Sequence, residues 1–428
     1  MVESDLSEIL SESVRSALIE TIENHLKTKD FEYKLSSAAK GGDNFMGIVQ
    51  RVTYNKTVKN GQSDNETDKS KFILKTAPLN VARRETFPCR AGFLREIYLY
   101  DNVLPYFKEF QQSRGIIVEE DGFSQYPKCY RWLDTEPNEC LMLEDLTFND
   151  FTMIDRRRET ITADHVNLVM ELLGKLHAIS FALKDQQPEK FEKITSNLSE
   201  IFMAEGKSEL IEYFESLKTT ALAAISSEDN VHLFDKVNEL YAQKQFHIAA
   251  ECVNSELAQP YAVICHGDCW TNNMMFKYDD NHKPIDARLI DWQIARYASP
   301  VTDLIYYLFC CIAKEVRDKH YDEFFKTYHQ SLSAFLKRLG SDPSKLFPYD
   351  VMLEHLHKFG KFGLVMATAA LPMITSEEGT SPDLDELANN LSENRKLNVN
   401  VFMTDNSKEE FNKRMRDVII DMVRLDYL

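Results

Sequence analysis

The hydrophobic pattern of this 428-residue chain changes its period once, near residue 145, and that change limits the folds open to it. Before this point, short apolar runs alternate with polar residues and are separated by glycine and asparagine, which is typical of strands. After residue 160, apolar residues recur at the spacing of amphipathic helices. A chain of this length also exceeds one small core. We therefore expect an α+β fold with a β-rich first lobe and a mostly helical second lobe.

The first 145 residues are predicted to form a mostly antiparallel sheet with one inserted helix. An amphipathic helix over residues 6–26 precedes two strands in "FEYKLSSAAKGGDNFMGIVQRVTYN", which turn at Gly41–Asn44. Further strands are expected in "KFILKTA", "GIIVEE" and "ECLMLEDL". The inserted helix, in "REIYLYDNVLPYF", is predicted to end near Pro105, because proline disrupts a helix interior.

The second part of the chain reads as helices interrupted by one short β element. The stretch "TADHVNLVMELLGKLHAISFALK" is predicted to form a helix capped by Thr162, and helical periodicity continues to about residue 257. Strands are then expected in "YAVICHGD", "NNMMFKY" and "DARLIDWQ", before helices resume at Pro300. Residues 376–396 are predicted to form a loop. This order places "CHGD" and "LIDWQ" at the seam between the lobes.

Charge and cysteine content exclude several classes of protein. The net charge of −18 argues against non-specific binding to nucleic acid or to an anionic membrane. No apolar run approaches the ~18 residues of a membrane span, and the acidic start of the chain does not resemble a signal peptide. The eight cysteines have no regular spacing, so we expect reduced thiols in a cytoplasmic protein.

The stretch "CHGDCWTNN", residues 265–273, fits three kinds of site: a metal site, a redox pair or the catalytic loop of a phosphotransferase. A zinc site would need a second pair of ligands, but Cys310 and Cys311 are adjacent inside an apolar segment. A redox pair prefers the C-x-x-C spacing, whereas Cys265 and Cys269 are four residues apart. The catalytic loop is the interpretation we favour.

Phosphoryl transfer needs positioned charges more than covalent chemistry. Asp268 is suited to accept the proton of an acceptor hydroxyl or to orient that hydroxyl. Asn273 follows five residues later and offers an amide oxygen to Mg²⁺, a hard cation that prefers oxygen ligands. Asp291, at the end of an apolar strand, is suited to bridge the metal and the phosphates.

These residues carry a family resemblance. His266-Gly267-Asp268, then four residues and Asn273, followed by "LIDWQ", resemble the choline kinase and aminoglycoside phosphotransferase branch of the protein-kinase-like fold. The fuller strings "HGDCWTNNMMF", "GGDNFMG", "FLREIYLYDNVLP" and "LMLEDL" resemble the ecdysteroid kinase-like family, over about residues 35–370. The resemblance implies a helical extension over residues 1–30, a nucleotide-binding N-lobe over 31–146 and a helical C-lobe with the acceptor pocket over 147–428.

The resemblance also implies an ATP site in the N-lobe. Lys75 would contact the nucleotide phosphates and Glu96 would be its ion-pair partner; the alternative is a strand-edge lysine and a solvated helix residue. The turn over the phosphates would contain Gly42, Asp43 and Asn44. This turn departs from the G-x-G-x-x-G of protein kinases, and a plain hairpin turn is the alternative. Backbone groups at the hinge would meet the adenine edge; these belong to Glu144, Asp145 and Leu146, whose charges could equally be those of a solvated linker.

Three further residues near these motifs are interpreted as structural. His266 is expected to brace the backbone of the loop instead of binding a metal, and His177 to be packed and hydrogen-bonded on an apolar helix face. Asp303 could brace the catalytic loop from the next helix and, without conflict, could also be a first-turn acid stabilised by the helix dipole.

The resemblance implies an ATP- and Mg²⁺-dependent kinase that phosphorylates a hydroxyl group of a small molecule, with an ecdysteroid or a similar apolar alcohol as the expected acceptor. A choline- or ethanolamine-type kinase and a catalytically inactive nucleotide-binding protein of the same fold are the alternatives. The helical segment 189–257 and the lack of an "APE"-like segment after "DWQ" argue against a protein kinase. We expect no nucleic acid or membrane partner, and a monomer or weak dimer.

Overall fold

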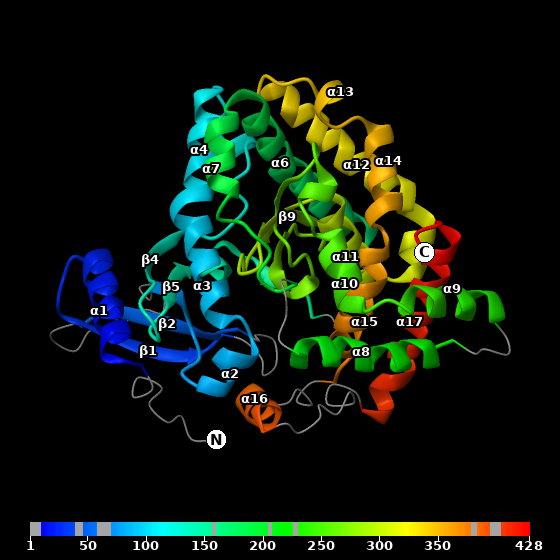
Figure 1. Cartoon of the computed structure of the whole chain (residues 1–428). Coiled ribbons are helices and arrows are strands. Elements are labelled where there is room, and N and C mark those ends of the chain that lie inside the picture. The colour runs from blue at the N-terminus through cyan, green and yellow to red at the C-terminus, as the bar shows by residue number, and fades with distance from the viewer. Residues whose placement is uncertain are drawn as a thin grey trace.

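The computed structural model describes residues 10–38, 46–57, 70–155, 160–203, 208–225, 230–377, 383–393 and 404–428. Figure 1 shows a lobe that contains a sheet beside a larger, mostly helical lobe. The prediction of an α+β fold with a β-rich first lobe and a mostly helical second lobe is therefore confirmed. The predicted phosphate turn at Gly42, Asp43 and Asn44 lies outside the described residues.

The first lobe is built on a five-stranded sheet in which every neighbouring pair is antiparallel, as predicted. Across the sheet the strands are β1 Phe31–Ser37, β2 Ile48–Lys56, β3 Ser70–Thr76, β5 Cys140–Glu144 and β4 Cys129–Leu133. Lys75 on β3 pairs with Val49 on one side and Leu141 on the other. A central strand is paired on both sides, so it fixes the backbone of Lys75 firmly.

Helix α1, Glu12–Leu26, packs on this sheet. Ser11 caps it, with its side chain accepting a hydrogen bond from the Val14 N–H. Leu18 and Ile22 are fully buried against Val52 and other strand residues. The N-terminal helix thus shares a core with the sheet.

Two details of the inserted helical region correct the sequence analysis. The elements here are α2 Val81–Thr86, α3 Cys89–Tyr98, a π-helical turn Leu99–Val103, α4 Leu104–Ser113 and α5 Val118–Asp121. The predicted end near Pro105 is wrong, because the helical backbone continues from the π-helical turn into α4, whose first turn contains this proline. The predicted strand in "GIIVEE" is also wrong, because residues 118–120 of this run belong to α5. The sheet instead contains β4, further along the chain, which the sequence analysis did not predict.

The second lobe is built around long buried helices. These are α6 Ala163–Gln186, α11 Val301–Cys311, α12 Lys314–Arg338 and α15 Lys361–Ile374. Around them lie α7 Pro188–Thr195, α8 Ser208–Ala223, α9 Val231–Tyr241, α10 Gln245–Cys252, α13 Pro343–Leu346, α14 Tyr349–Phe359 and α17 Asp405–Arg424. Within the described ranges, α6 alone is long and apolar enough to cross a membrane, and 78% of that stretch is buried in the protein. Its composition therefore reflects packing in the core.

The prediction of a loop over residues 376–396 is also wrong, since this segment contains helix α16, Leu384–Ser392. The acidic and asparagine-rich composition hides a helix whose Leu384, Leu387 and Ala388 side chains are buried. It packs on α2 of the first lobe, where Arg83 forms an ion pair of 3.2 Å with Asp385. Figure 1 shows α16 beside α2 at the base of the molecule.

Short β elements place the motifs of the seam. Strand β7 Val263–Cys265 pairs with β10 Arg296–Ala298, and β8 Met274–Tyr278 pairs with β9 Pro284–Leu289 and β6 Thr152–Met153. The segment from His266 to Asn273 is the loop between β7 and β8, and Asp291 follows β9. The predicted β interruption of the helical lobe is thus confirmed. The two motifs emerge from neighbouring strand ends.

Candidate active site

Lys75 of the first lobe contacts two carboxylates, one from its own lobe and one from the second lobe. Its Nζ donates to Glu96 Oε2 at 2.7 Å and to Asp291 Oδ1 at 2.8 Å. Lys75 is 3% exposed and Glu96 is fully buried, so solvent screens their interaction little. Burial alone would lower the pKa of Lys75, but Asp291 and Glu96 raise it above its ordinary value. The lysine is therefore held as a cation between β3, α3 and the segment after β9.

Asp291 reaches Lys75 because of an uncommon backbone conformation. Its φ is 65°, in the left-handed region that aspartate tolerates better than most residues. The next residue, Trp292, donates its backbone N–H to Glu96 Oε1 at 3.3 Å. Both oxygens of Glu96 are thus engaged, one by Lys75 and one by the segment that carries Asp291. This geometry excludes the alternative of a solvated Glu96.

Asp268 has a hydrogen-bond donor on each carboxylate oxygen. Asn273 Nδ2 donates to Oδ2 at 2.7 Å, and the Tyr306 hydroxyl donates to Oδ1 at 3.0 Å. Burial raises the pKa of Asp268 to about 6, and the negative charge of Asp291 adds to this effect, although the two hydrogen bonds oppose it. A carboxylate with a pKa near 6 is still ionised at neutral pH and is a stronger base than an ordinary aspartate.

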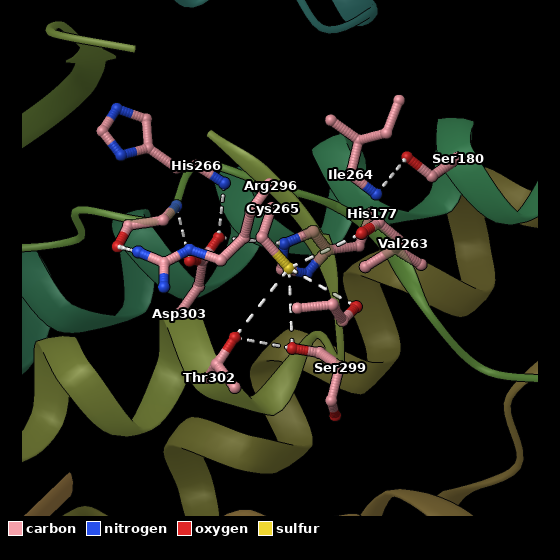
Figure 2. Close-up of polar contacts among 12 residues, drawn as sticks. His177, Ser180, Val263, Ile264, Cys265, His266, Arg296, Ser299, Thr302 and Asp303 are labelled. Carbon is pink, nitrogen blue, oxygen red and sulfur yellow. Dashed lines mark hydrogen bonds and ion pairs between the residues drawn. The ribbon is translucent and has the colours of Figure 1, made fainter. Parts of the chain in front are cut away.

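The backbone of the catalytic loop is held by Asp303, near the start of α11. The N–H groups of His266 and Gly267 donate to its two oxygens at 2.8 and 2.9 Å. His177 on α6 lies 3.3 Å from the same carboxylate and 3.0 Å from the Tyr328 hydroxyl. Figure 2 shows this cluster in the buried space between α6, α11 and β7. The predictions of a bracing Asp303 and a packed, hydrogen-bonded His177 are confirmed.

Gly267 and His266 complete the support of the loop. Gly267 has a φ of 87°, and a Cβ there would lie 2.1 Å from the carbonyl oxygen of Ile294. Its own carbonyl accepts from Arg296 Nη2 at 2.7 Å. His266 Nε2 donates to the carbonyl of Ile290 at 3.0 Å, and burial lowers the pKa of this histidine, which keeps the ring neutral. His266 therefore braces the backbone, as predicted.

The same region contains a set of residues that could suggest a metal site. Potential ligand atoms of His177, Cys265 and Asp303 lie within 4.8 Å of one another, and all three residues are buried. The Cys265 thiol, however, contacts the carbonyl oxygens of Ala298 and Ser299, and burial raises its pKa well above the usual range. A protonated thiol is a poor metal ligand. Hydrogen bonds satisfy the polar groups of His177, Cys265 and Asp303 without a metal ion. None of the eight cysteines of the chain forms a disulfide.

A cavity of about 430 Å³ opens between the lobes beside this site. Predicted site residues that line it are Lys75, Glu96, Glu144, Asp145, Leu146, Asn273 and Asp291. Asp268 is not among its lining residues, but it is bonded to Asn273, which is. The structure therefore gathers seven predicted residues around one cavity, with Asp268 directly behind.

The hinge does not fit the alternative of solvated linker charges. Asp145 is 2% exposed and forms an ion pair of 2.6 Å with Arg51 on β2, so it is not a solvated linker charge. Its carboxylate also accepts from the Thr147 N–H at 3.1 Å. The Glu144 carboxylate accepts from the Lys128 N–H at 3.1 Å. These side chains hold the hinge in place, which leaves the backbone of the hinge to form the wall of the cavity.

Two contributors escaped the sequence analysis. Arg51 lies 94 residues before its partner Asp145, and no local pattern links them. Tyr306 could have been inferred, since it follows Asp303 by three residues and helical spacing places both on one face of α11.

A lobe built on an antiparallel sheet, a buried lysine linked to two carboxylates and a braced loop with an aspartate and an asparagine together define a kinase-like phosphotransferase. The sequence model of the ecdysteroid kinase-like family matches residues 41–341, and the chain belongs to this family. It is thus a phosphotransferase whose acceptor is a hydroxyl group of a small molecule.

Comparison with solved structures finds distant similarity to aminoglycoside phosphotransferases. The GDP complex of wild-type aminoglycoside 2′-phosphotransferase-IIIa is 12% identical, with a TM-score of 0.42 over 96% of this chain and 99% of that chain. The GDP complex of a point mutant of the same enzyme is 11% identical, with a TM-score of 0.41 over 95% and 98% of the two chains. No curated protein sequence matches the chain.

The crowding at Gly267 leads to a prediction about folding. Gly267→Ala should lower the free energy of unfolding by about 1–2 kcal/mol for the left-handed backbone and by a further ~1–3 kcal/mol for the clash with Ile294. Gly115→Ala is the matched control, because Gly115 also has a positive φ, of 73°, but has no atom within 4 Å of the new Cβ. Denaturant unfolding of both variants checks this. Equal losses would show that the close approach to Ile294 is not part of the native loop.

Proposed function

We propose that this enzyme transfers the γ-phosphoryl group of ATP, with Mg²⁺, to a hydroxyl group of an ecdysteroid or a similar apolar alcohol. The observation that carries the proposal is the link from Lys75 through Asp291 to the cavity that also contains Asn273. It brings a cation, a carboxylate and an amide oxygen together beside Asp268, which is partly buried. These are the groups that phosphoryl transfer requires.

In this proposal Asp268 acts on the acceptor. Its hydrogen bonds to Asn273 and Tyr306 fix the carboxylate, and each oxygen keeps lone pairs that can accept a hydrogen bond from an alcohol. The proton of the hydroxyl passes to Asp268 as the oxygen attacks phosphorus and the bond to the leaving oxygen of ADP breaks. Asp268 is placed beyond Asn273 and does not line the cavity, which suits a role on the acceptor and not on the nucleotide.

Asn273 and Asp291 are suited to hold the metal. Asn273 uses its amide nitrogen on Asp268, which leaves its amide oxygen as the available ligand atom. The Asp291 side chain is 17% exposed toward the cavity, and it supplies a charged oxygen. Hard oxygen donors of this kind match the preference of Mg²⁺, which would neutralise charge on the phosphates.

Lys75 and Glu96 are suited to hold the nucleotide phosphates. Glu96 keeps one lysine hydrogen bond through the buried 2.7 Å contact, and the remaining N–H groups of the ammonium can serve Asp291 and a phosphate oxygen. The adenine would lie against the hinge, at the backbone of Glu144, Asp145 and Leu146. Ile73 and Leu143 line the same cavity and provide apolar contact for a flat ring.

The acceptor class rests on the family to which the chain belongs. Tyr306 lies against Asp268, and its ring is 6.5 Å from the ring of Phe362 on α15, so buried aromatic side chains pack on one side of the proposed base. Phosphorylation would convert an apolar alcohol into an anion, which a membrane or an apolar receptor site rejects.

Two substitutions should separate the proposed acceptor site from the nucleotide site. Asp268→Asn keeps the shape but cannot accept a proton, so turnover should fall about 10²–10⁴-fold while the Kd for MgATP stays within about twofold. Asp291→Ala should instead weaken Mg²⁺-dependent nucleotide binding, because it removes a charged ligand. Calorimetry with MgATP and a phosphate-transfer assay measure both. Loss of nucleotide affinity in the Asp268 variant would assign this residue to the nucleotide.

The pKa of Asp268 sets an expected pH dependence. Its carboxylate is the active form, so activity should be full above the pKa and should fall as the pH decreases through about 6. An aspartate with the ordinary value of 3.8 would keep its activity to much lower pH. The profile of kcat/KM between about pH 5 and about pH 8 measures the difference. A flat profile down to the acid end would contradict the proposed role.

The acceptor can be identified with a panel of alcohols. We expect mass spectrometry to find a phosphate adduct on an ecdysteroid after incubation with enzyme and MgATP, and none on choline, ethanolamine or an aminoglycoside. Enzyme with Asp268→Asn is the control for non-enzymatic transfer. An adduct on choline or ethanolamine alone would refute the steroid acceptor and retain the kinase. No adduct on any alcohol would favour an inactive nucleotide-binding protein.

A further inference from the structure

Helix α11 contacts the catalytic loop with two side chains. Asp303 and Tyr306 are three residues apart, so they lie on the same face of the helix. Asp303 accepts hydrogen bonds from two backbone N–H groups of the loop, at 2.8 and 2.9 Å. Tyr306, one turn further on, donates to the side chain of Asp268 at 3.0 Å. One rigid helix therefore fixes both the backbone of the loop and its carboxylate.

The Tyr306 hydroxyl holds one oxygen of Asp268 while Asn273 holds the other. The two donors lie 3.0 and 2.7 Å from Oδ1 and Oδ2. An aspartate side chain that is bonded through only one oxygen can rotate about its last carbon–carbon bond, because this torsion has a broad minimum. Donors on both oxygens remove that freedom. The direction of the remaining lone pairs is therefore set.

Tyr306 is itself firmly held. The residue is 5% exposed, and its ring packs edge-on against Phe362 of α15. Helix α11 makes one of the most extensive helix contacts in the lobe with α15. The tyrosine hydroxyl is thus at a fixed place relative to the loop.

The neighbouring Tyr307 provides an internal comparison. It lies on the same helix and is 1% exposed, yet its buried hydroxyl has no hydrogen-bond partner in the described part of the chain. Burial of a tyrosine on α11 therefore does not by itself bring its hydroxyl to a partner. The contact between Tyr306 and Asp268 is specific to that position.

We propose that Tyr306 is a positioning residue, which holds the Asp268 carboxylate in the orientation that receives the proton of the acceptor hydroxyl. The proposal rests on the proposed role of Asp268. It predicts that the hydroxyl of Tyr306 affects the rate of transfer and leaves nucleotide binding unchanged, because the tyrosine is not among the residues that line the nucleotide cavity.

The test compares Tyr306→Phe with Tyr307→Phe, since each removes one buried hydroxyl from the same helix. The probe is the slow release of labelled phosphate from MgATP into water, where water takes the place of the alcohol. Loss of a positioned base costs about 10²–10⁴-fold, and Tyr306→Phe removes one of the two donors that position Asp268, so kcat should fall by about 10- to 100-fold. The KM for MgATP and the melting temperature should change little. Tyr307→Phe should retain the rate of the unmodified enzyme.

A double-mutant cycle with Asp268→Asn separates positioning from a general structural effect. If Tyr306 acts through the carboxylate, Tyr306→Phe should cause no further loss once Asp268 is Asn. An equal loss in both backgrounds would overturn the inference. A slow Asp268 variant together with a normal Tyr306→Phe enzyme would refute this inference alone, whereas a normal Asp268 variant would refute the proposed function as well.

Crystal structures of the same variants give a readout that needs no turnover. The Asp268 carboxylate should keep one orientation in the unmodified enzyme and in Tyr307→Phe, and should adopt more than one in Tyr306→Phe. The hydrogen bonds from His266 and Gly267 to Asp303 should remain in all three. A single, unchanged orientation of Asp268 without the Tyr306 hydroxyl would overturn the inference.

Discussion

The site depends on the hydrogen bonds between the buried carboxylate of Asp303 and the backbone of the catalytic loop. Burial would raise the pKa of Asp303, but the hydrogen bonds from His177 and from the backbone of Gly267 lower the pKa below the ordinary value, so the group stays ionised. A buried charge is tolerated only where donors replace water, and here two backbone N–H groups of the catalytic loop do so. The loop and the carboxylate therefore stabilise each other. Gly267 is required at the same place because no side chain fits beside Ile294.

A second buried network connects this loop region to the first lobe. Lys75 on β3 binds Glu96 on α3 and Asp291 after β9, while Arg95 on α3 donates to the carbonyls of Ala295 and Ser199. Truncating one partner of such a network leaves a buried charge uncompensated, which typically costs about 3–5 kcal/mol. The two lobes are thus joined by charge pairing at the place where the cavity opens. Structural support and the proposed phosphate site share the same residues.

Much of this organisation could be predicted from the sequence, for reasons that particular residues make clear. The change of period near residue 145 predicted the two lobes, and the family resemblance of "CHGDCWTNN" predicted a catalytic loop whose backbone is braced by His266. Pro105 and "GIIVEE" were misinterpreted because a proline at a helix start and a short apolar run fit more than one structure. The pairing of Arg51 with Asp145 joins residues 94 positions apart, and such contacts depend on the sheet register, which a single sequence does not reveal. The contact of Tyr306 with Asp268 depends in addition on how α11 docks beneath the loop.

A crystal structure with Mg²⁺ and a non-hydrolysable ATP analogue would test the central claim most directly. The account predicts that the triphosphate lies in the cavity between the lobes, with Lys75 on its oxygens, the metal on the amide oxygen of Asn273 and the carboxylate of Asp291, and Asp268 free of the nucleotide and facing the space beyond the γ-phosphate. Nucleotide bound elsewhere, or a metal held by Asp268 in place of Asn273 and Asp291, would contradict it.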